Sequence, residues 1–497
     1  MDLKFSPSDL SELKELFEKS LEIWHVPGLA VAVVKDGQTI LCEGYGLRNL
    51  ASPLPVTSET LFPIASCTKA FTVIALGMLV DAGKLDWDRP LKQYLPDFQM
   101  WDAFATDRLT PRDLLTHRSG LPGHDMVWYA SNFDRREIFK RLRYLEPSCD
   151  LRSKFQYQNL MFAIAGLLLE EIAGTGWEEF VQQRIFDPLG MIHSNFSTEV
   201  TQQSADFASP HYYHNGQLKV IPFLKQDARR HGTGPAGSIC SCASDMVKWL
   251  QVHLNHGKFG EQAMISEATL EEMHTPQIFV DDPTGKNRYG YEFTSYGLGW
   301  GMRSHKGQFL VEHDGMTDGF YVLTSFMPRH NIGVIALSNS DAYYHPVQDN
   351  LVPNIITYTL YDRLLGLEPT DWNTLMKLVH DEREDEFGHY MEEQALASPK
   401  VNAPASHPIE AYLGEYEHPG YGRVSIQKAG EQLRMVFEKL TFPLEHCYYD
   451  IFEAIFEMNG QRQKMAFLGD LEGNIDRVAC PLEPRVKEII FKRVTNI

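Results

Sequence analysis

The segment SCTKAFTVIALGMLV, residues 66–80, carries almost no polar side chain after its first turn. Gly83 follows the apolar run and gives a helix stop. A helix that is apolar nearly all round lies inside a protein, so we predict a central, buried helix here. Ser66 and Lys69, three residues apart, then lie on one face of its first turn. A buried lysine needs a polar pocket, so the segment also predicts a polar site at the mouth of this helix.

The pairing of a serine with a lysine suggests a chemical role. A serine hydroxyl is a poor nucleophile until a base removes its proton, and a partly desolvated amine beside it is a suitable base. The same spacing recurs at Ser11–Lys14, on a charged surface helix, and at Ser425–Lys428, in a strand and its turn. Only Ser66 opens a buried helix, so Ser66 and Lys69 are the candidates for acyl transfer. The alternative is a capping serine followed by a snorkelling lysine.

Composition narrows the class of protein. The chain has 497 residues and a formal net charge of −20, which argues against nucleic acid or an anionic membrane as a partner. Its start has no signal-peptide pattern, and its apolar stretches are shorter than the roughly 20 residues that span a bilayer. Seven dispersed cysteines suit reduced thiols, and Cys240-Ser241-Cys242 lacks the spacing of a zinc site. We therefore expect a cytoplasmic protein.

The order of the elements predicts an α+β fold. A helix over Leu10–Trp24 precedes the strands Gly28–Lys35 and Thr39–Tyr45, which the turn at Asp36-Gly37 joins as a hairpin. A helical region covers about residues 62–259. Strands then return at Tyr296–Arg303, Phe309–His313, Gly319–Met327 and Ile332–Ser338. We expect an antiparallel sheet built from both ends of this unit and flanked by helices, with an all-helical region between.

The chain divides into three parts on its composition. Residues 1–368 form the α+β unit, and residues 369–408 form a charged helix with a Pro/Ala/Ser-rich end that acts as a linker. Residues 409–497 show short alternating strands broken by glycines, which is typical of a small β-barrel or sandwich. The boundary between the sheet and the helical region is where we expect a cleft.

A second motif, Tyr157-Gln158-Asn159, stands where the chain turns into a helix over Leu160–Ala173. Tyr157 can shuttle the Ser66 proton if the neighbouring amine lowers its pKa, and Asn159 can bind Lys69 and a substrate amide carbonyl. The alternative is a helix cap with a packed aromatic ring.

A third motif, His313-Asp314-Gly315, closes a late strand of the sheet. A histidine at this place can donate to an anion or relay a proton near neutral pH, and we expect His313 to contact the substrate. Gly315 would let a substrate backbone approach a sheet edge.

Together, these three motifs in this order resemble the serine β-lactamase and penicillin-binding-protein superfamily. The resemblance is closest to class-C-type members with a His-x-Gly third motif, such as certain D-aminopeptidases, family VIII-type esterases and related serine peptidases. Past the linker, Tyr412-Leu413-Gly414-Glu415-Tyr416 resembles the lipocalin-like barrel that follows this domain in some peptidases and peptide cyclases. The resemblance implies a β-lactamase/transpeptidase-like sheet followed by a small barrel, through which copies of the chain can form a homo-oligomer.

The resemblance also implies a mechanism. Ser66 attacks a carbonyl while Lys69 and Tyr157 share the role of general base, and the backbone N–H groups of Ser66 and Met316 hold the oxyanion. No metal or organic cofactor is needed. The expected activity is hydrolysis of amide or ester bonds in a small molecule or peptide, by a peptidase that can be D-residue-directed or by an esterase.

Three alternatives remain beside this expectation. A β-lactamase and an acyl or peptidyl transferase (a cyclase) use the same scaffold, but the neutral histidine in place of a permanent cation at His313 weakens the case for a penicillin substrate. A non-catalytic scaffold or binding protein is the third. An α/β-hydrolase and a metallopeptidase are disfavoured, because the chain lacks Gly-x-Ser-x-Gly and His-Glu-x-x-His.

Overall fold

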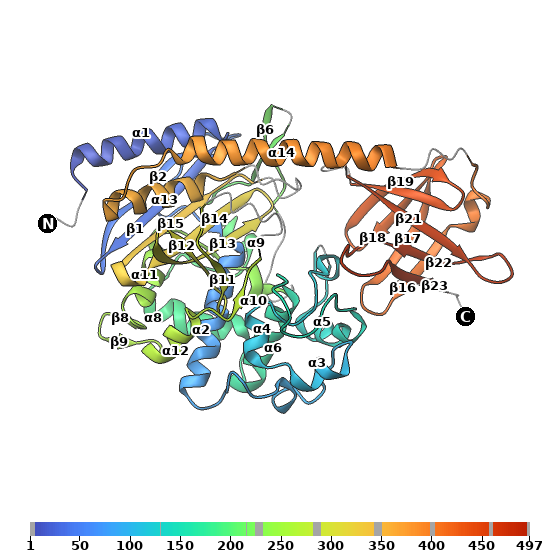
Figure 1. Cartoon of the computed structure of the whole chain (residues 1–497), viewed down its shortest axis with the longest axis horizontal. Helices are drawn as coiled ribbons and strands as arrows, with labels where there is room; N and C mark the ends of the chain where they lie inside the picture. Colours follow the sequence, from blue (N-terminus) through green and yellow to red (C-terminus); the bar gives the residue numbers. More distant parts are fainter. Residues whose placement is uncertain are drawn as a thin grey trace.

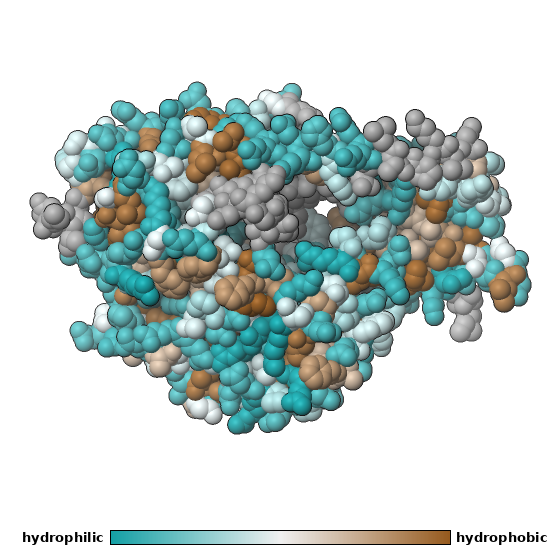
Figure 2. All heavy atoms as spheres, viewed as in Figure 1, coloured by the Kyte–Doolittle hydropathy of each residue, from teal (hydrophilic) through white to brown (hydrophobic). Residues whose placement is uncertain are grey.

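The computed structural model describes residues 5–129, 131–214, 216–223, 232–281, 290–341, 350–397, 403–456 and 461–494. Figure 1 shows a unit of sheet and helices on the left, a barrel on the right, and the long helix α14 running along the top between them. The face in Figure 2 is mainly hydrophilic, in keeping with the high charge of the chain.

The centre of the larger unit is a nine-stranded antiparallel sheet in the order β10-β11-β12-β13-β14-β15-β1-β2-β3. The early strand β1 lies between β2 and the late strand β15, so both ends of the unit build one sheet, and the predicted α+β class is confirmed. The bounds are β1 Gly28–Lys35, β2 Gln38–Asn49, β3 Leu54–Pro55, β10 Ile278–Phe279, β11 Thr294–Tyr296, β12 Gly301–His305, β13 Gln308–Thr317, β14 Phe320–Met327 and β15 Ile332–Ser338.

Helices cover both faces of this sheet. On one face, α1 (Pro7–Ile23) and α13 (Val352–Leu365) pack on Leu29, Val31 and Val33 of β1. The alternate residues Ala30, Ala32 and Val34 face the opposite side of the sheet, where they pack in one hydrophobic core with the buried residues of the helical region. Because both faces are covered, this strand reads as one unbroken apolar run rather than as an alternating one.

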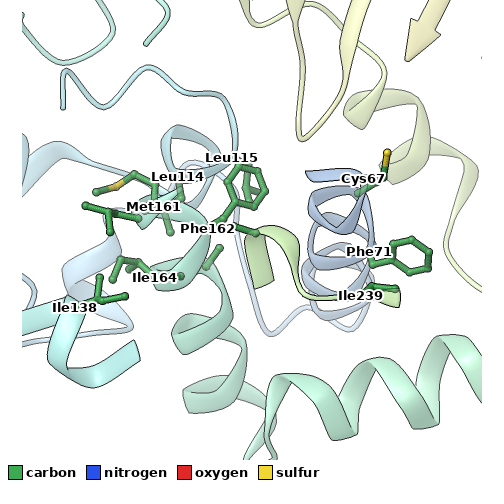
Figure 3. Packing of buried hydrophobic residues seen from close by; sticks show 14 of the residues in the cluster. Cys67, Phe71, Leu114, Leu115, Ile138, Met161, Phe162, Ile164 and Ile239 are labelled. Atoms are coloured by element: carbon green, nitrogen blue, oxygen red, sulfur yellow. The ribbon is translucent and has the colours of Figure 1, made fainter. Parts of the chain in front are cut away.

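The helical region is built around α2 (Thr68–Asp81) and α6 (Leu160–Ala173), as predicted. The short helix α10 (Gly234–Gly237) lies against both. Figure 3 shows buried side chains of this core on either side of the pair, with Met161, Phe162 and Ile164 on α6 and Phe71 on α2. A Cβ on Gly166 of α6 would come 2.2 Å from Cγ of Pro235 in α10, so the glycine is what lets the two helices meet.

The remaining elements of the unit are shorter. The helices are α3 Ala103–Arg108, α4 Pro111–Leu115, α5 Arg135–Arg141, α7 Trp177–Val181, α8 Asp187–Leu189, α9 Thr198–Thr201, α11 Ala243–Leu254 and α12 Glu267–Met273. Three two-stranded sheets lie among them: β4 Phe62–Pro63 with β7 Cys240–Ser241, β5 His211–His214 with β6 Gln217–Val220, and β8 Lys258–Phe259 with β9 Gln262–Ala263.

One predicted strand differs in the structure. The segment Tyr296–Arg303 is split between β11 and β12 by a turn at Gly299, whose φ is +70°. The N–H of Gly299 donates to the carbonyl of Leu115 at 3.1 Å, so a contact with the helical region breaks the strand. Leu115 is far from Gly299 in the chain, so the local sequence could not predict this contact.

The long helix α14 (Trp372–Ala397) leads to an eight-stranded closed barrel. Its strands are β16 Gly414–His418, β17 Gly422–Ala429, β18 Gln432–Phe437, β19 Leu440–Tyr448, β20 Ile451–Phe456, β21 Gln461–Gly469, β22 Ile475–Cys480 and β23 Ile489–Arg493. Residues 398–402 of the predicted linker lie outside the described part. Buried aromatic rings occupy the barrel core, among them Tyr412, Tyr416, Phe437, Phe467 and Phe491.

Among the described residues, no single helix has both the length and the apolar character to cross a bilayer. The pair Leu160–Ala173 and Trp177–Leu189 meets the two criteria only when taken together, across a bend of 75°.

Candidate active site

Ser66 lies at the mouth of α2, in a turn of 3₁₀ helix over Ala65–Cys67. The preceding Ala65 has a φ of +44°, a costly conformation for a residue with a side chain. Ser66 is partly exposed, whereas its neighbours on both sides are buried. It borders a cavity of about 380 Å³ whose other lining residues include Asp125, Trp128, Tyr129, Tyr157, Asn159, Gly237, Asp314, Met316 and Asp318.

Two side chains hydrogen-bond the Ser66 hydroxyl. Lys69 Nζ lies 2.9 Å from Ser66 Oγ, and the Tyr157 hydroxyl donates to the same oxygen at 2.8 Å. Lys69 Nζ also donates to Asn159 Oδ1 at 2.8 Å and to the Ala236 carbonyl at 3.0 Å. The structure therefore brings together four residues that the sequence singled out, and adds the Ala236 carbonyl from α10.

The helix α6 places Tyr157 and Asn159, because both precede its first residue. Asn159 stands at the N-cap position but makes no capping hydrogen bond. Gln158 does so instead: its Oε1 accepts from the Met161 N–H at 3.0 Å. The Asn159 side chain is thereby left to bind Lys69, so the predicted Asn159–Lys69 pair is present and the alternative of a simple helix cap is not.

Burial separates the two candidate bases. Lys69 is fully buried, and desolvation lowers its pKa to about 7. Desolvation also raises the pKa of Tyr157 well above its ordinary value, so the phenol keeps its proton. With two N–H bonds of a neutral Lys69 directed at Asn159 and Ala236, its lone pair is free to accept the Ser66 proton.

His313 lies behind the cavity rather than on its wall. Its ring is buried, its Nδ1 contacts the Asp314 carbonyl, and its Nε2 lies 2.8 Å from the Tyr296 hydroxyl. Since a carbonyl only accepts, Nδ1 carries the hydrogen and Nε2 accepts from Tyr296. Burial lowers the pKa of His313 to about 4, so the ring is neutral. Both ring nitrogens therefore have protein partners, and contact of His313 with a substrate stays a prediction.

The residues after His313 reach the cavity. Strand β12 pairs with β13 only as far as Glu312, so among the described strands the end of β13 pairs with β14 alone. Met316, 40 % exposed, lines the cavity there. A Cβ on Gly315 would come 2.1 Å from the Ile64 carbonyl oxygen. The turn before Ser66 therefore already requires a glycine here, and the approach of a substrate backbone to Gly315 stays a prediction.

Sequence reasoning missed part of the cavity wall. Asp125, Trp128 and Tyr129 come from one loop, and Asp318 follows β13. These residues lie in no motif, so no sequence signal could have found them. Ala236 lies in the stretch Gly234-Pro235-Ala236-Gly237-Ser238, whose turn-forming residues are a weak signal. Within the described ranges, no group of three or more His, Cys, Asp or Glu side chains is arranged to hold a metal ion.

Comparisons with known proteins extend over both parts of the chain. A hydrolase of unguisins from Aspergillus campestris is 29 % identical over 84 % of this chain and 77 % of its own length. Protein flp from Staphylococcus aureus is 23 % identical over 72 % of this chain and 68 % of its own length.

Solved structures share the fold. The octameric penicillin-binding protein homologue from Pyrococcus abyssi superposes with a TM-score of 0.62 at 22 % identity, covering 97 % of this chain and all of that one. SurE gives a TM-score of 0.55 at 18 % identity, covering 97 % and 99 %.

Two family models match the sequence directly. A domain of unknown function, DUF3471, matches residues 398–493, which include the barrel. The Beta-lactamase model matches residues 13–352, well over half of the chain and the whole of the Ser66 site. The chain belongs to the Beta-lactamase family.

Proposed function

We propose that the protein is a serine hydrolase that cleaves amide or ester bonds through an acyl-enzyme on Ser66. One observation carries the proposal: a partly exposed hydroxyl at a cavity is hydrogen-bonded at once by a lysine with a lowered pKa and by a tyrosine phenol. The likeness to a relative named a hydrolase supports hydrolysis as the outcome.

In the proposed reaction, Ser66 Oγ forms a bond to the substrate carbonyl carbon as its proton passes to the neutral Lys69 amine. The oxyanion is held by the backbone N–H groups of Ser66 and Met316. When the tetrahedral intermediate collapses, the bond to the leaving group breaks. Lys69 gives up the proton, and Tyr157, which donates to the same Oγ, relays it to the departing nitrogen or oxygen. Water then attacks the acyl-enzyme by the same steps.

The charge of the cavity bears on the substrate. Asp125, Asp314 and Asp318 line it, and its described lining residues include no lysine or arginine. The neutral His313 adds no positive charge. A substrate with a carboxylate beside its reacting carbonyl, such as a β-lactam, finds little to pair with. We therefore favour a peptide, including one with D-residues, or an ester.

The nucleophile is tested by labelling. We expect a fluorophosphonate to add one adduct to the wild-type protein, seen by intact mass, and none to Ser66→Ala. The matched control is Ser11→Ala, because Ser11 also precedes a lysine by three residues but is exposed on α1. An unlabelled wild type, or equal labelling of Ser66→Ala, would refute the proposal and leave the non-catalytic scaffold.

The substrate class is tested with three chromogenic compounds. We expect p-nitrophenyl butyrate or D-Ala-p-nitroanilide to be turned over with a kcat/KM at least about tenfold above that of nitrocefin, a loss of about 1.4 kcal/mol or more in transition-state binding for the lactam. Nitrocefin as the best substrate would instead identify a β-lactamase. A product joined to an added amine would identify a transferase.

The assembly of the chain is a separate question. We propose a homo-oligomer through the barrel, an expectation that the octameric Pyrococcus abyssi homologue supports only by likeness of fold. Light scattering should give a multiple of the 56.7 kDa chain mass. A single-chain mass at micromolar concentration would rule the oligomer out.

A further inference from the structure

One wall of the active-site cavity directly follows His124, a residue that is hydrogen-bonded by the barrel. Asp125, Trp128 and Tyr129 line the cavity, and Trp128 Nε1 donates to Asp125 Oδ1 at 2.7 Å. The residue directly before them, His124, is fully buried and has φ 45° and ψ 38°. This left-handed conformation is unfavourable for a residue with a side chain, so outside contacts must hold it.

Those contacts come largely from the barrel. The backbone N–H of His124 donates to Glu483 Oε2 at 2.9 Å, and its ring Nδ1 lies 2.7 Å from the Tyr421 hydroxyl. Glu483 lies between β22 and β23, and Tyr421 lies in the turn between β16 and β17. The other ring nitrogen, Nε2, lies 3.0 Å from the Glu146 carbonyl.

The hydrogen-bond roles are fixed by chemistry. The Glu146 carbonyl can only accept, so Nε2 of His124 carries the hydrogen. Nδ1 is then an acceptor, and Tyr421 donates to it. Burial lowers the pKa of His124, which keeps this neutral form. Tyr421 is itself fully buried, so its hydroxyl has no water to replace the histidine if the pair separates.

A second set of contacts holds the same barrel turn in place. Arg141 of α5 donates to the carbonyls of Pro419 and Gly420 at 3.1 and 3.4 Å. A Cβ on Gly420 would come 2.8 Å from Leu145 Cδ2, so the turn lies directly against the helical region. The barrel turn that carries Tyr421 is therefore fixed on the unit that carries Ser66.

We propose that the barrel shapes the active site through His124, with Tyr421 and Glu483 as positioning residues that set the cavity wall Asp125–Tyr129. The proposal rests on the proposed function at Ser66 for its kinetic consequence. Loss of the hydrogen bonds from Tyr421 and Glu483 to His124 should weaken binding of substrates that fill the 380 Å³ cavity. The chemical step at Ser66 should be unchanged.

The kinetic test compares two esters with the same leaving group. In Tyr421→Phe, we expect kcat/KM for p-nitrophenyl octanoate to fall roughly three- to tenfold, mainly through KM, and kcat/KM for p-nitrophenyl acetate to change less than about twofold. The matched control is Tyr416→Phe, which removes an equally buried barrel hydroxyl bonded to the Tyr412 carbonyl and Arg493. This control should leave both esters unaffected.

A second variant pair tests the other contact. Glu483→Gln keeps an oxygen acceptor for the His124 N–H and should behave nearly as wild type, whereas Glu483→Ala should resemble Tyr421→Phe. Rescue by glutamine distinguishes positioning from a general effect of charge.

Hydrogen exchange provides a readout that needs no catalysis. Amides within residues 121–129 should exchange at least about threefold faster in Tyr421→Phe than in wild type and Tyr416→Phe. Unchanged exchange there, or equal losses for both esters, would overturn the proposal. If the fluorophosphonate does not label Ser66 while exchange rises as expected, the proposed function is refuted, but the positioning of the cavity wall by the barrel is supported.

Discussion

At the scale of a single residue, burial changes the chemical properties of Lys69. A fully buried ammonium is unfavourable, and here the amine lies among an amide oxygen, a backbone carbonyl and the Ser66 hydroxyl. No carboxylate of the described residues is in hydrogen-bond contact with it. Its pKa falls to about 7, so a large share of the molecules hold a neutral amine at neutral pH. The surroundings of Lys69 are thus what fit it for the proposed role of base.

This pKa predicts the pH dependence of the reaction. Protonation removes the base, so kcat/KM should fall as pH drops through about 7 and level off above it. Lys69→Met should lower kcat/KM by roughly 10²–10⁴-fold, while the matched variant Lys14→Met, on the exposed face of α1, should not.

Tyr157→Phe serves as the second control for this profile. It should slow the reaction but keep the acid limb near pH 7, because the phenol is protonated throughout that range. An acid limb that moves or disappears in Tyr157→Phe would assign the base to the tyrosine instead.

At the scale of elements, the site depends on how α2, α6 and α10 meet. Thr72 of α2 donates to the Pro235 carbonyl at 2.7 Å, and the Ala236 carbonyl of α10 accepts from Lys69. Gly166 of α6 makes room for Pro235. A shift of α10 would therefore move a hydrogen-bond acceptor of the Lys69 amine, the proposed base.

Gly166→Ala tests this junction. Its Cβ would overlap Pro235, so we expect a loss of roughly 1–3 kcal/mol in the free energy of unfolding and a lower kcat. Gly388→Ala is the control: a Cβ on this glycine of α14 would meet no other described part of the molecule within 4 Å, and alanine should stabilise by up to about 1 kcal/mol. Urea unfolding measures the free energy of unfolding of both variants. An unchanged value in Gly166→Ala would contradict this account, because α10 would then move aside without a loss of stability.

At the scale of the whole molecule, α14 joins the two parts and is anchored at its first residue. Trp372 Nε1 donates to Asp362 Oδ2 at 2.8 Å, Lys306 Nζ contacts the same oxygen at 2.7 Å, and His305 Nε2 lies 2.9 Å from Oδ1. Burial opposes ionisation of Asp362, but these hydrogen bonds outweigh it and lower its pKa.

A lowered carboxyl pKa stabilises the fold above the unfolded-state pKa, and the stabilisation is lost as pH falls through the folded-state value. We therefore expect wild type to lose stability with acid below about pH 4, and Asp362→Asn to lose less over that range. At pH 7 the variant should be less stable by about 2 kcal/mol or more, because three donors lose a charged acceptor. Parallel acid-unfolding curves for the two proteins would contradict this account.

Much of the fold and site could be predicted because their signals are local. The run from Ala70 to Val80 requires a buried helix, the turn Asp36-Gly37 a hairpin, and the Ser66–Lys69 spacing one helix face. Each depends on residues within a few positions of one another, and the structure contains all three.

The tertiary structure alone decided which way His313 faces, that a strand breaks at Gly299, and that Asn159 binds Lys69 rather than its own helix. It also decided that the barrel holds His124 at the edge of the cavity. The reason is physical: in each case the partner lies far away in the chain, and a side chain's direction and pKa depend on what packs against it. The sequence by itself determined the Ser66–Lys69 pair and the elements that carry it. Packing determined the lowered pKa of Lys69, the walls of the cavity and the residues that contact the pair.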